Sequence, residues 1–123
     1  MGEPLELGDG LEWVVDAFGC EPAALRSPDQ LRDLFTRAVS ELGLHPVGAP
    51  NVHTFPGHGG VTAVQLLSES HLTVHTFPER RYAAFNLYCC RVRPEWPWAE
   101  RLAELLGAER VEVRRLARPG REG

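Results

Sequence analysis

The sequence Ser-Glu-Ser-His at residues 68–71 places hydroxyl, carboxylate and imidazole groups side by side in the middle of an apolar run. A second histidine, His75, follows in "LTVHTFPE". A polar stretch between two strand-forming runs is usually a hairpin turn whose side chains are solvated and inert. This turn, however, lacks the glycine, asparagine or aspartate that tight hairpins favour, and paired strands would bring Thr62 and Cys90 close to it. The stretch therefore predicts either an ordinary turn or a site of acyl chemistry.

The histidines also permit an interpretation as a metal site. His71 and His75 are an even number of residues apart, so they share one face of a regular strand. His53 and His58, from the preceding loop, could complete a ligand set. No HxH or CxxC spacing accompanies these histidines, and loop histidines are more often surface residues. We therefore expect no metal.

The elements that must position these groups begin with a strand and a helix. β-Branched and aromatic residues predict a strand at 11–18. Ser27, Pro28 and Gln30 then form a helix start with a capping box. Apolar residues at helical spacing follow, and the run ends at Gly43.

The remaining elements alternate between turns and strand patterns, with one more helix. Short connections predict antiparallel hairpins between the central strands. In chain order we expect an irregular edge strand at Leu44–Val52, a loop at 53–60, strands at Val61–Leu67, His71–Phe77 and Tyr82–Cys89, a helix ending at Gly107, and a strand at 110–116. The order β-α-β-β-β-β-α-β predicts a single domain over residues 1–123 with an α/β fold. It would be a two-layer α/β sandwich, with a mostly antiparallel sheet and two helices on one face.

The other sheet face would then be uncovered. The central strands carry few charges and are apolar on both sides. An antiparallel sheet with two apolar faces needs a second cover. A homodimer is the commonest solution, and we expect one here, joined across sheet faces or edges.

Composition excludes several classes of partner. The net charge of −4 and the absence of a basic stripe before the arginines near the C-terminus argue against nucleic acid. No apolar run is long enough to span a membrane, and the first residues lack the pattern of a signal peptide. Three cysteines cannot all pair within one chain. We therefore expect free thiols in a cytoplasmic protein.

Two segments, "GVTAVQLLSESHLTVHTFPE" and "YAAFNLYCC", resemble the prokaryotic S-adenosylmethionine decarboxylases. In that family a Ser-Glu-Ser-His segment, followed by a second segment with His-Thr, an aromatic residue and Pro-Glu, carries self-processing. A cysteine follows the next strand. The resemblance extends more weakly to most of the chain and implies a pyruvoyl-dependent decarboxylase that supplies the aminopropyl donor for spermidine synthesis.

The resemblance implies that the chain makes its own cofactor. Ser70 Oγ would attack the carbonyl of Glu69 and turn the peptide bond into an ester. Elimination and hydrolysis would then leave a pyruvoyl group at position 70 and two fragments, 1–69 and 70–123. This pyruvate-derived group would bind the substrate as a Schiff base and act as the electron sink for decarboxylation.

The same match implies roles for three further residues. Thr62 stands where the family has a serine that assists the acyl shift. His75 matches the histidine that takes the α-proton during elimination, and Cys90 matches the thiol that protonates the substrate carbon. Cys89 points to the opposite sheet face on a regular strand and should be structural. Because Ser70 and His75 are an odd number of residues apart, the match requires a turn or bulge at Ser70.

The substrate contacts implied by the resemblance are Phe55, which would stack on adenine, and Glu79, which would hold the ribose hydroxyls. Phe55 is equally well explained as a plain core aromatic residue. The chain departs from the family pattern at Glu12, Phe77, Arg80, Arg81 and Asn86. Relatives with the same processing chemistry decarboxylate arginine or ornithine, so these substrates are an alternative. A non-catalytic or metal-binding domain that kept only the fold is another.

Overall fold

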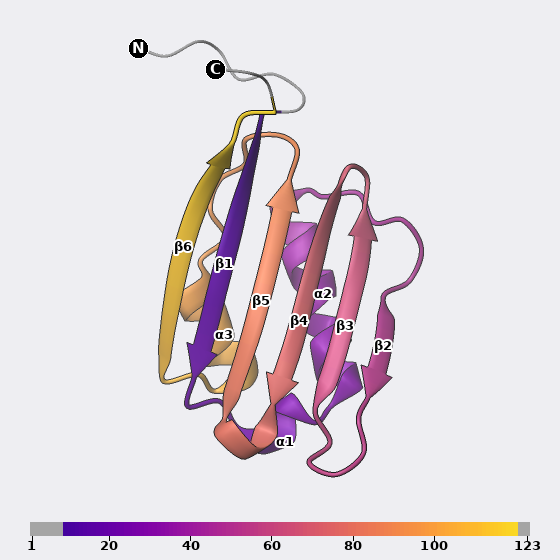
Figure 1. Cartoon of the computed structure of the whole chain (residues 1–123), viewed down its shortest axis with the longest axis vertical. Coiled ribbons are helices and arrows are strands. Elements are labelled where there is room, and N and C mark those ends of the chain that lie inside the picture. The colour runs from indigo at the N-terminus through magenta and orange to yellow at the C-terminus, as the bar shows by residue number, and fades with distance from the viewer. Residues whose placement is uncertain (1–8, 121–123) are drawn as a thin grey trace.

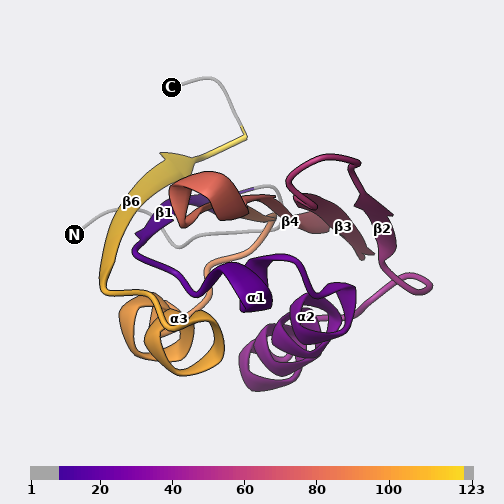
Figure 2. The same cartoon turned by 90° about the horizontal axis from the view of Figure 1, so that it is seen from below.

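The protein folds as one six-stranded antiparallel sheet with its helices on one face (Figures 1 and 2). The structure, a computed structural model, describes residues 9–120. The strands are ordered β2-β3-β4-β5-β1-β6 across the sheet. In chain order the elements are β1 (Gly10–Phe18), α1 (Pro22–Leu25), α2 (Pro28–Leu42), β2 (Asn51–Thr54), β3 (Val61–Leu67), β4 (Ser70–Phe77), the 3-10 helix η1 (Pro78–Arg80), β5 (Tyr82–Cys89), α3 (Trp98–Leu106) and β6 (Arg110–Arg118).

Alternation along the strands sets which sheet face is buried. In β4, Leu72, Val74 and Thr76 are buried against the helices, whereas the residues between them point to the other face. The two long helices cover the buried face with apolar stripes that include Leu34 of α2 and Leu102 of α3. Because strand side chains alternate between the two faces, this pattern fixes the side on which each site residue lies.

The predicted fold class is confirmed. The helix capped by Ser27, whose hydroxyl accepts a hydrogen bond from the backbone N–H of Gln30 at 3.2 Å, runs as expected to Gly43. Three differences concern short elements: the helices α1 and η1 are not expected from the sequence, and β2 covers Asn51–Thr54 rather than Leu44–Val52. Pro46 makes only an isolated bridge to Leu67, and the strand begins after Pro50, since proline removes a ladder donor.

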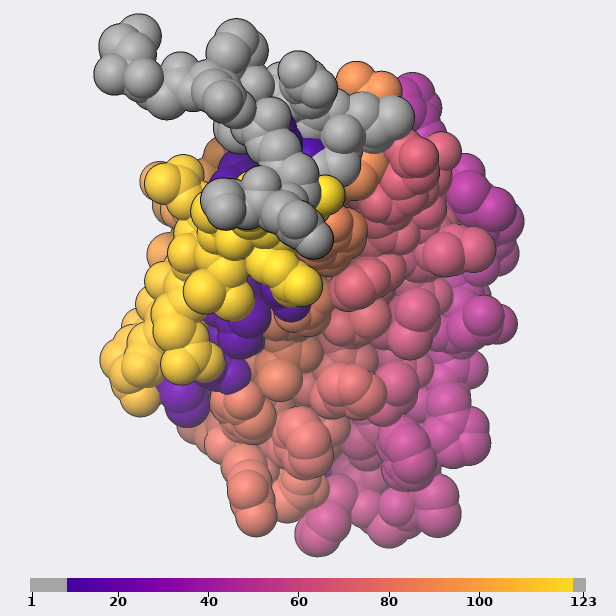
Figure 3. All heavy atoms as spheres, turned by 45° about the horizontal axis from the view of Figure 1, so that its top comes forward, coloured from indigo at the N-terminus to yellow at the C-terminus, as the bar shows by residue number. Residues whose placement is uncertain are grey.

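The face opposite the helices is open, as Figure 2 shows edge-on. In the space-filling view, β3, β4, β5 and β6 form one broad surface with no helix over them (Figure 3). Large apolar side chains exposed on this face include Val64, Leu66 and Leu116.

Charged and polar groups occupy the middle of the same open face, so the prediction of an apolar second face is only partly right. Asn86 joins His71 to Glu12 through hydrogen bonds of 2.8 Å on each side, and Arg118 donates to the Glu12 carboxylate at 2.6 Å. The hydrogen bond from Asn86 is the largest cause that lowers the pKa of Glu12.

No helix within residues 9–120 is long and apolar enough to cross a membrane.

Candidate active site

Thr62 and His75 form a direct pair on the open face near one end of the sheet. They are opposite one another in the β3–β4 register, and a hydrogen bond of 2.8 Å joins Thr62 Oγ1 to His75 Nδ1. The hydroxyl and the imidazole are thus already oriented toward each other. Such a pair can pass a proton between an oxygen nucleophile and a base.

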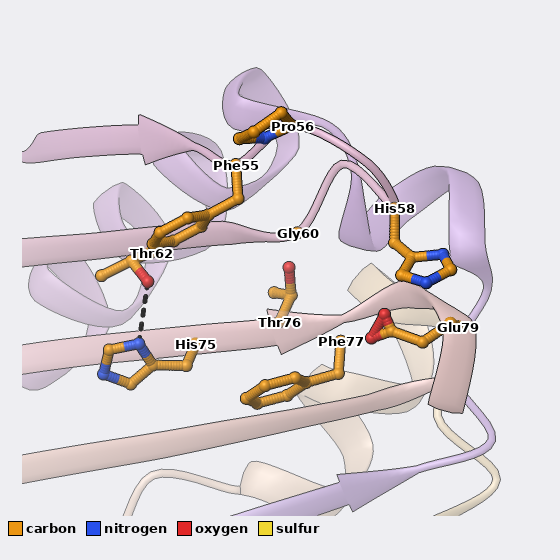
Figure 4. Close-up of a pocket in the computed structure, with 9 residues that line it drawn as sticks. All are labelled: Phe55, Pro56, His58, Gly60, Thr62, His75, Thr76, Phe77 and Glu79. Atoms are coloured by element: carbon orange, nitrogen blue, oxygen red, sulfur yellow. Dashed lines mark hydrogen bonds between the residues drawn. The ribbon is translucent and has the colours of Figure 1, made fainter.

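This pair borders a cavity of about 340 Å³ at the lower end of the sheet in Figure 1, shown in close-up in Figure 4. Phe55 and Phe77 contribute aromatic rings to it, and both are exposed, at 48% and 38% of their surface. Phe55 is therefore not the core aromatic of the alternative interpretation. The lining comprises Phe55, Pro56, His58, Gly60, Thr62, His75, Thr76, Phe77 and Glu79.

A buried hydroxyl fixes the floor of this cavity. Thr76 Oγ1 accepts a hydrogen bond from the backbone N–H of Val61 at 2.9 Å and donates one to the carbonyl of Leu25 at 2.7 Å. Thr76 is 4% exposed. At Gly60 a Cβ atom would come within 2.7 Å of the Thr76 carbonyl oxygen, so only glycine fits there. The short helix α1 thereby anchors the strand ends that carry the site.

The cleavage candidate lies at the opposite end of the same sheet (Figure 1, top). Glu69 has a left-handed backbone with φ of 59° in the β3–β4 turn, a conformation that normally favours glycine or asparagine. Ser70 follows as the first residue of β4 and is half-buried. The Cys90 thiol donates to the Glu69 carboxylate at 3.5 Å. The two predicted cleavage residues and the predicted proton donor are therefore neighbours.

Cys89 lies on the helix side of the sheet, as predicted. It is 1% exposed, and burial raises the pKa of its thiol to about 11. The β4–β5 register, extended by one residue beyond the pair of His71 with Tyr88, places Cys89 opposite Ser70. Its position and its protonated state suit a packing role.

The segment after Cys90 is fixed by the end of α2. Glu41 accepts hydrogen bonds from Trp96 Nε1 at 2.7 Å and from Arg101 Nε at 2.9 Å, and it forms an ion pair with Arg37 at 2.8 Å. The hydrogen bonds from Arg37, Arg101 and Trp96 lower the pKa of the Glu41 carboxyl to about 2. These contacts hold the irregular stretch between β5 and α3 against the helix layer.

Ser70 and His75 do not meet within one chain. β4 is a regular strand from Ser70 to Phe77, and five residues of strand span roughly 16 Å. Ser70 also shares the helix side with Leu72, whereas His75 points to the open face. The predicted turn at Ser70 is present, but it does not bring the two side chains together as the match requires.

The histidines do not form a metal site. No group of three or more His, Cys, Asp or Glu side chains within residues 9–120 is arranged to hold a metal ion. His71 and His75 share the open face, as expected from their spacing, but each is hydrogen-bonded to another side chain, Asn86 and Thr62 respectively.

Comparison with known proteins places these features in one family. The family model described as S-adenosylmethionine decarboxylase matches residues 11–119. A protein of Geobacillus kaustophilus named S-adenosylmethionine decarboxylase proenzyme is 34% identical over 113 residues, which cover 89% of this chain and 90% of that protein. The proenzyme of Thermococcus gammatolerans is 37% identical over 86 residues, 70% of this chain.

The crystal structure of the adenosylmethionine decarboxylase from Aquifex aeolicus superposes with a TM-score of 0.76. It covers 95% of this chain and 96% of that one at 24% sequence identity, which supports the fold. The region of this chain that matches the Thermococcus gammatolerans protein spans only 59% of the length of that relative.

Proposed function

This chain belongs to the S-adenosylmethionine decarboxylase family, and from that premise we propose that it is a self-processing, pyruvoyl-dependent decarboxylase of S-adenosylmethionine. Its product would be the aminopropyl donor for spermidine synthesis. The observation that carries the proposal is the strained Glu69–Ser70 turn beside Cys90, in a chain whose relatives are named as proenzymes. The free state of all three cysteines fits the cytoplasm as its compartment.

The residues at positions 69 and 70 fit the formation of a pyruvoyl group. A left-handed glutamate costs roughly 1–3 kcal/mol, and breaking the peptide bond after it would release that strain. In the first step Ser70 Oγ attacks the Glu69 carbonyl carbon, so that the C–O bond forms, the C–N bond breaks, and the serine nitrogen becomes a free amine. Elimination then removes the α-proton of residue 70 and expels the Glu69 carboxylate. Water replaces the nitrogen, which leaves as ammonia.

Thr62 and His75 supply the proton transfers in this proposal. The hydroxyl of Thr62 would assist the acyl shift, and the His75 imidazole would take the α-proton during elimination. His75→Ala should therefore stall at the ester, which hydroxylamine cleaves. A variant that still releases the 70–123 fragment at the parent rate would remove His75 from the proposed mechanism.

A homodimer would account for the distance between Ser70 and His75, provided that Ser70, at the first position of β4, turns its hydroxyl from the helix side around the strand end toward the open face. If two open faces pack about a two-fold axis that reverses the strand direction, the Ser70 end of one protomer lies over the His75 end of its partner. Exposed apolar residues on that face, such as Val64 and Leu66, supply the surface to be covered. Each site would then combine Ser70, Glu69 and Cys90 from one chain with Thr62 and His75 from the other.

Complementation tests this shared site. Ser70→Ala and His75→Ala chains should each fail to cleave alone. When the two are co-expressed, the mixed dimer contains one site with both side chains intact, and the His75→Ala chain should be cleaved there. Light scattering on the parent protein should show a dimer at micromolar concentration. A stable monomer, or no cleavage in the mixture while the parent cleaves, would contradict a site shared between protomers.

In turnover the pyruvoyl group would supply the carbonyl electron sink for the carbanion that decarboxylation leaves. Cys90 would protonate the substrate carbon after carbon dioxide departs. Its thiol stands beside Glu69 in the uncleaved chain, which keeps it next to the position where the group forms.

The cavity favours a nucleoside substrate. Phe55 offers an exposed aromatic face for a purine, and Glu79, in the same cavity, offers a carboxylate for the ribose diol. Base stacking on an aromatic side chain contributes about 1–3 kcal/mol, so Phe55→Ala should raise KM roughly 5- to 150-fold. A free arginine or ornithine would use Glu79 but not Phe55.

Release of labelled carbon dioxide from carboxyl-labelled S-adenosylmethionine, ornithine and arginine, measured in parallel, tests the substrate. Turnover of an amino acid alone, with Phe55→Ala unchanged, would show that the basic amino-acid decarboxylase is the better assignment. No turnover of any of the three by a processed protein would favour a non-catalytic domain.

A further inference from the structure

Two exposed polar groups, the His58 imidazole and the Glu79 carboxylate, lie at one end of the substrate cavity. Figure 4 shows the His58 ring and the Glu79 carboxylate on the same side of the cavity, facing one another, with the Thr62–His75 pair at the other end. Within residues 9–120 neither side chain makes a hydrogen bond or an ion pair. Both groups are therefore free to bind a ligand that enters between them.

The loop that carries His58 is held in place from the helix layer. Arg26, the residue that follows α1, donates from Nε to the His58 carbonyl at 2.9 Å. Its methylene groups also lie against Gly59, where an added Cβ would be 3.4 Å from Arg26 Cδ and Cγ. Gly59 has φ of 77°, a left-handed backbone that suits glycine. Arg26 thus holds, from the helix side, the loop that presents the His58 imidazole.

Hydrogen-bond capacity limits what can fill the space between the two groups. An ionised carboxylate only accepts hydrogen bonds, whereas a neutral imidazole has one donor and one acceptor nitrogen. A vicinal diol satisfies both, because each hydroxyl can donate and accept. A ligand without hydroxyl groups at this end would leave the exposed His58 ring hydrogen-bonded to water alone.

We propose that His58 is a further substrate-binding residue, which with Glu79 clasps the vicinal diol of a ribosyl ligand, and that Arg26 is the residue that positions it. This subsite rests on the proposed nucleoside substrate and extends it to a residue outside the processing motif. The proposal also gives α1 a function. The carbonyl of Leu25, in α1, accepts the hydrogen bond of Thr76, and Arg26, directly after α1, positions the loop at the edge of the cavity.

The test measures binding without turnover. The full-length Ser70→Ala chain cannot form the pyruvoyl group, and titration calorimetry on it compares adenosine with 2′,3′-dideoxyadenosine, which lacks the diol. On this background His58→Ala should weaken adenosine binding about fivefold, the equivalent of one ordinary hydrogen bond. The dideoxy compound should lose less than twofold. His58→Gln, which keeps a donor and an acceptor, should restore part of the loss.

Two further variants separate positioning from a general disturbance. Arg26→Met keeps most of the packing on Gly59 but removes the donor to the His58 carbonyl, and it should weaken adenosine selectively, as His58→Ala does. Arg32→Met removes another exposed arginine, which pairs with Asp29 at 2.9 Å on α2 and does not line the cavity, and it should change neither affinity.

The outcomes distinguish the subsite from the function that it extends. Equal losses for both nucleosides, or no loss for adenosine, in His58→Ala would overturn the diol clasp while leaving the nucleoside pocket standing. A parent chain that binds neither nucleoside would overturn the pocket itself, and the clasp with it.

Discussion

The buried hydroxyl of Thr76 joins β3 and α1 at the end of the sheet that carries His75. Replacing Thr76 with valine tests the contribution of that hydroxyl to stability. The two side chains have nearly the same shape, so Thr76→Val removes the hydroxyl without opening a cavity. Two backbone groups lose their partner, the N–H of Val61 and the carbonyl of Leu25. A buried polar group left without a partner costs about 1–3 kcal/mol. Because two groups are affected, we expect the free energy of unfolding to fall by roughly 2–6 kcal/mol, a large share of the stability of a typical domain.

Urea denaturation of the Ser70→Ala chain, followed by tryptophan fluorescence at fixed protein concentration, measures this loss without interference from cleavage. Thr54→Val is the matched control, because Thr54 is also a strand threonine but is exposed. Its effect should stay within about 0.5 kcal/mol. A loss below about 1 kcal/mol for Thr76→Val would contradict a stabilising role of this hydroxyl. It would mean that water or a small shift of the backbone satisfies both the Val61 N–H and the Leu25 carbonyl.

Three other measurements concern the cysteines and Glu41. Cys90→Ala should still be processed at least partly yet decarboxylate poorly, whereas Cys89→Ala should cost only packing, up to roughly 1–2 kcal/mol; the opposite ranking would refute the assignment. In the folded chain a thiol reagent at pH 8 should react with Cys90 only, because burial raises the pKa of Cys20 and Cys89 to about 11; rapid reaction of all three would contradict the burial. The Glu41 carboxyl, whose folded-state pKa is lowered to about 2, stabilises the fold above its unfolded pKa. That contribution should vanish as pH falls from about 4.5 to 2 and be absent in Glu41→Gln, with tryptophan fluorescence as the probe; a parent acid transition identical to that of Glu41→Gln would argue against it.

Much of the fold could be predicted because, in the long strands and helices, the positions with apolar residues in the sequence are also the positions that the structure buries. The hairpin of β3 and β4 follows from its two apolar runs, and its register alone brings Thr62 opposite His75. The helix α1 could not be found from periodicity, since its four residues make barely one turn. Pro22 at its start was the only local signal.

The site could be predicted only in part, because its two halves lie at opposite ends of β4. The family resemblance implies that Ser70 and His75 act together, and their odd spacing on a strand then predicts a turn or bulge at Ser70. The burial of Leu72, Val74 and Thr76 instead keeps the strand regular. A single sequence also does not show which surface of a second protomer would face Ser70 in the proposed dimer. The sequence suggests His58 only as a metal ligand, because its proposed role in the cavity depends on Arg26, which lies 32 residues away in the sequence.

Intact mass spectrometry of the purified full-length chain shows whether the protein cleaves itself. Self-processing should give two fragments, one ending at Glu69 and one beginning at residue 70, the second lighter by one ammonia than a fragment that starts with serine. Ser70→Ala should remain a single chain under the same conditions. A wild-type protein that stays full length after folding, with a mass indistinguishable from expectation for the uncleaved sequence, would contradict self-processing and with it the proposed catalytic mechanism.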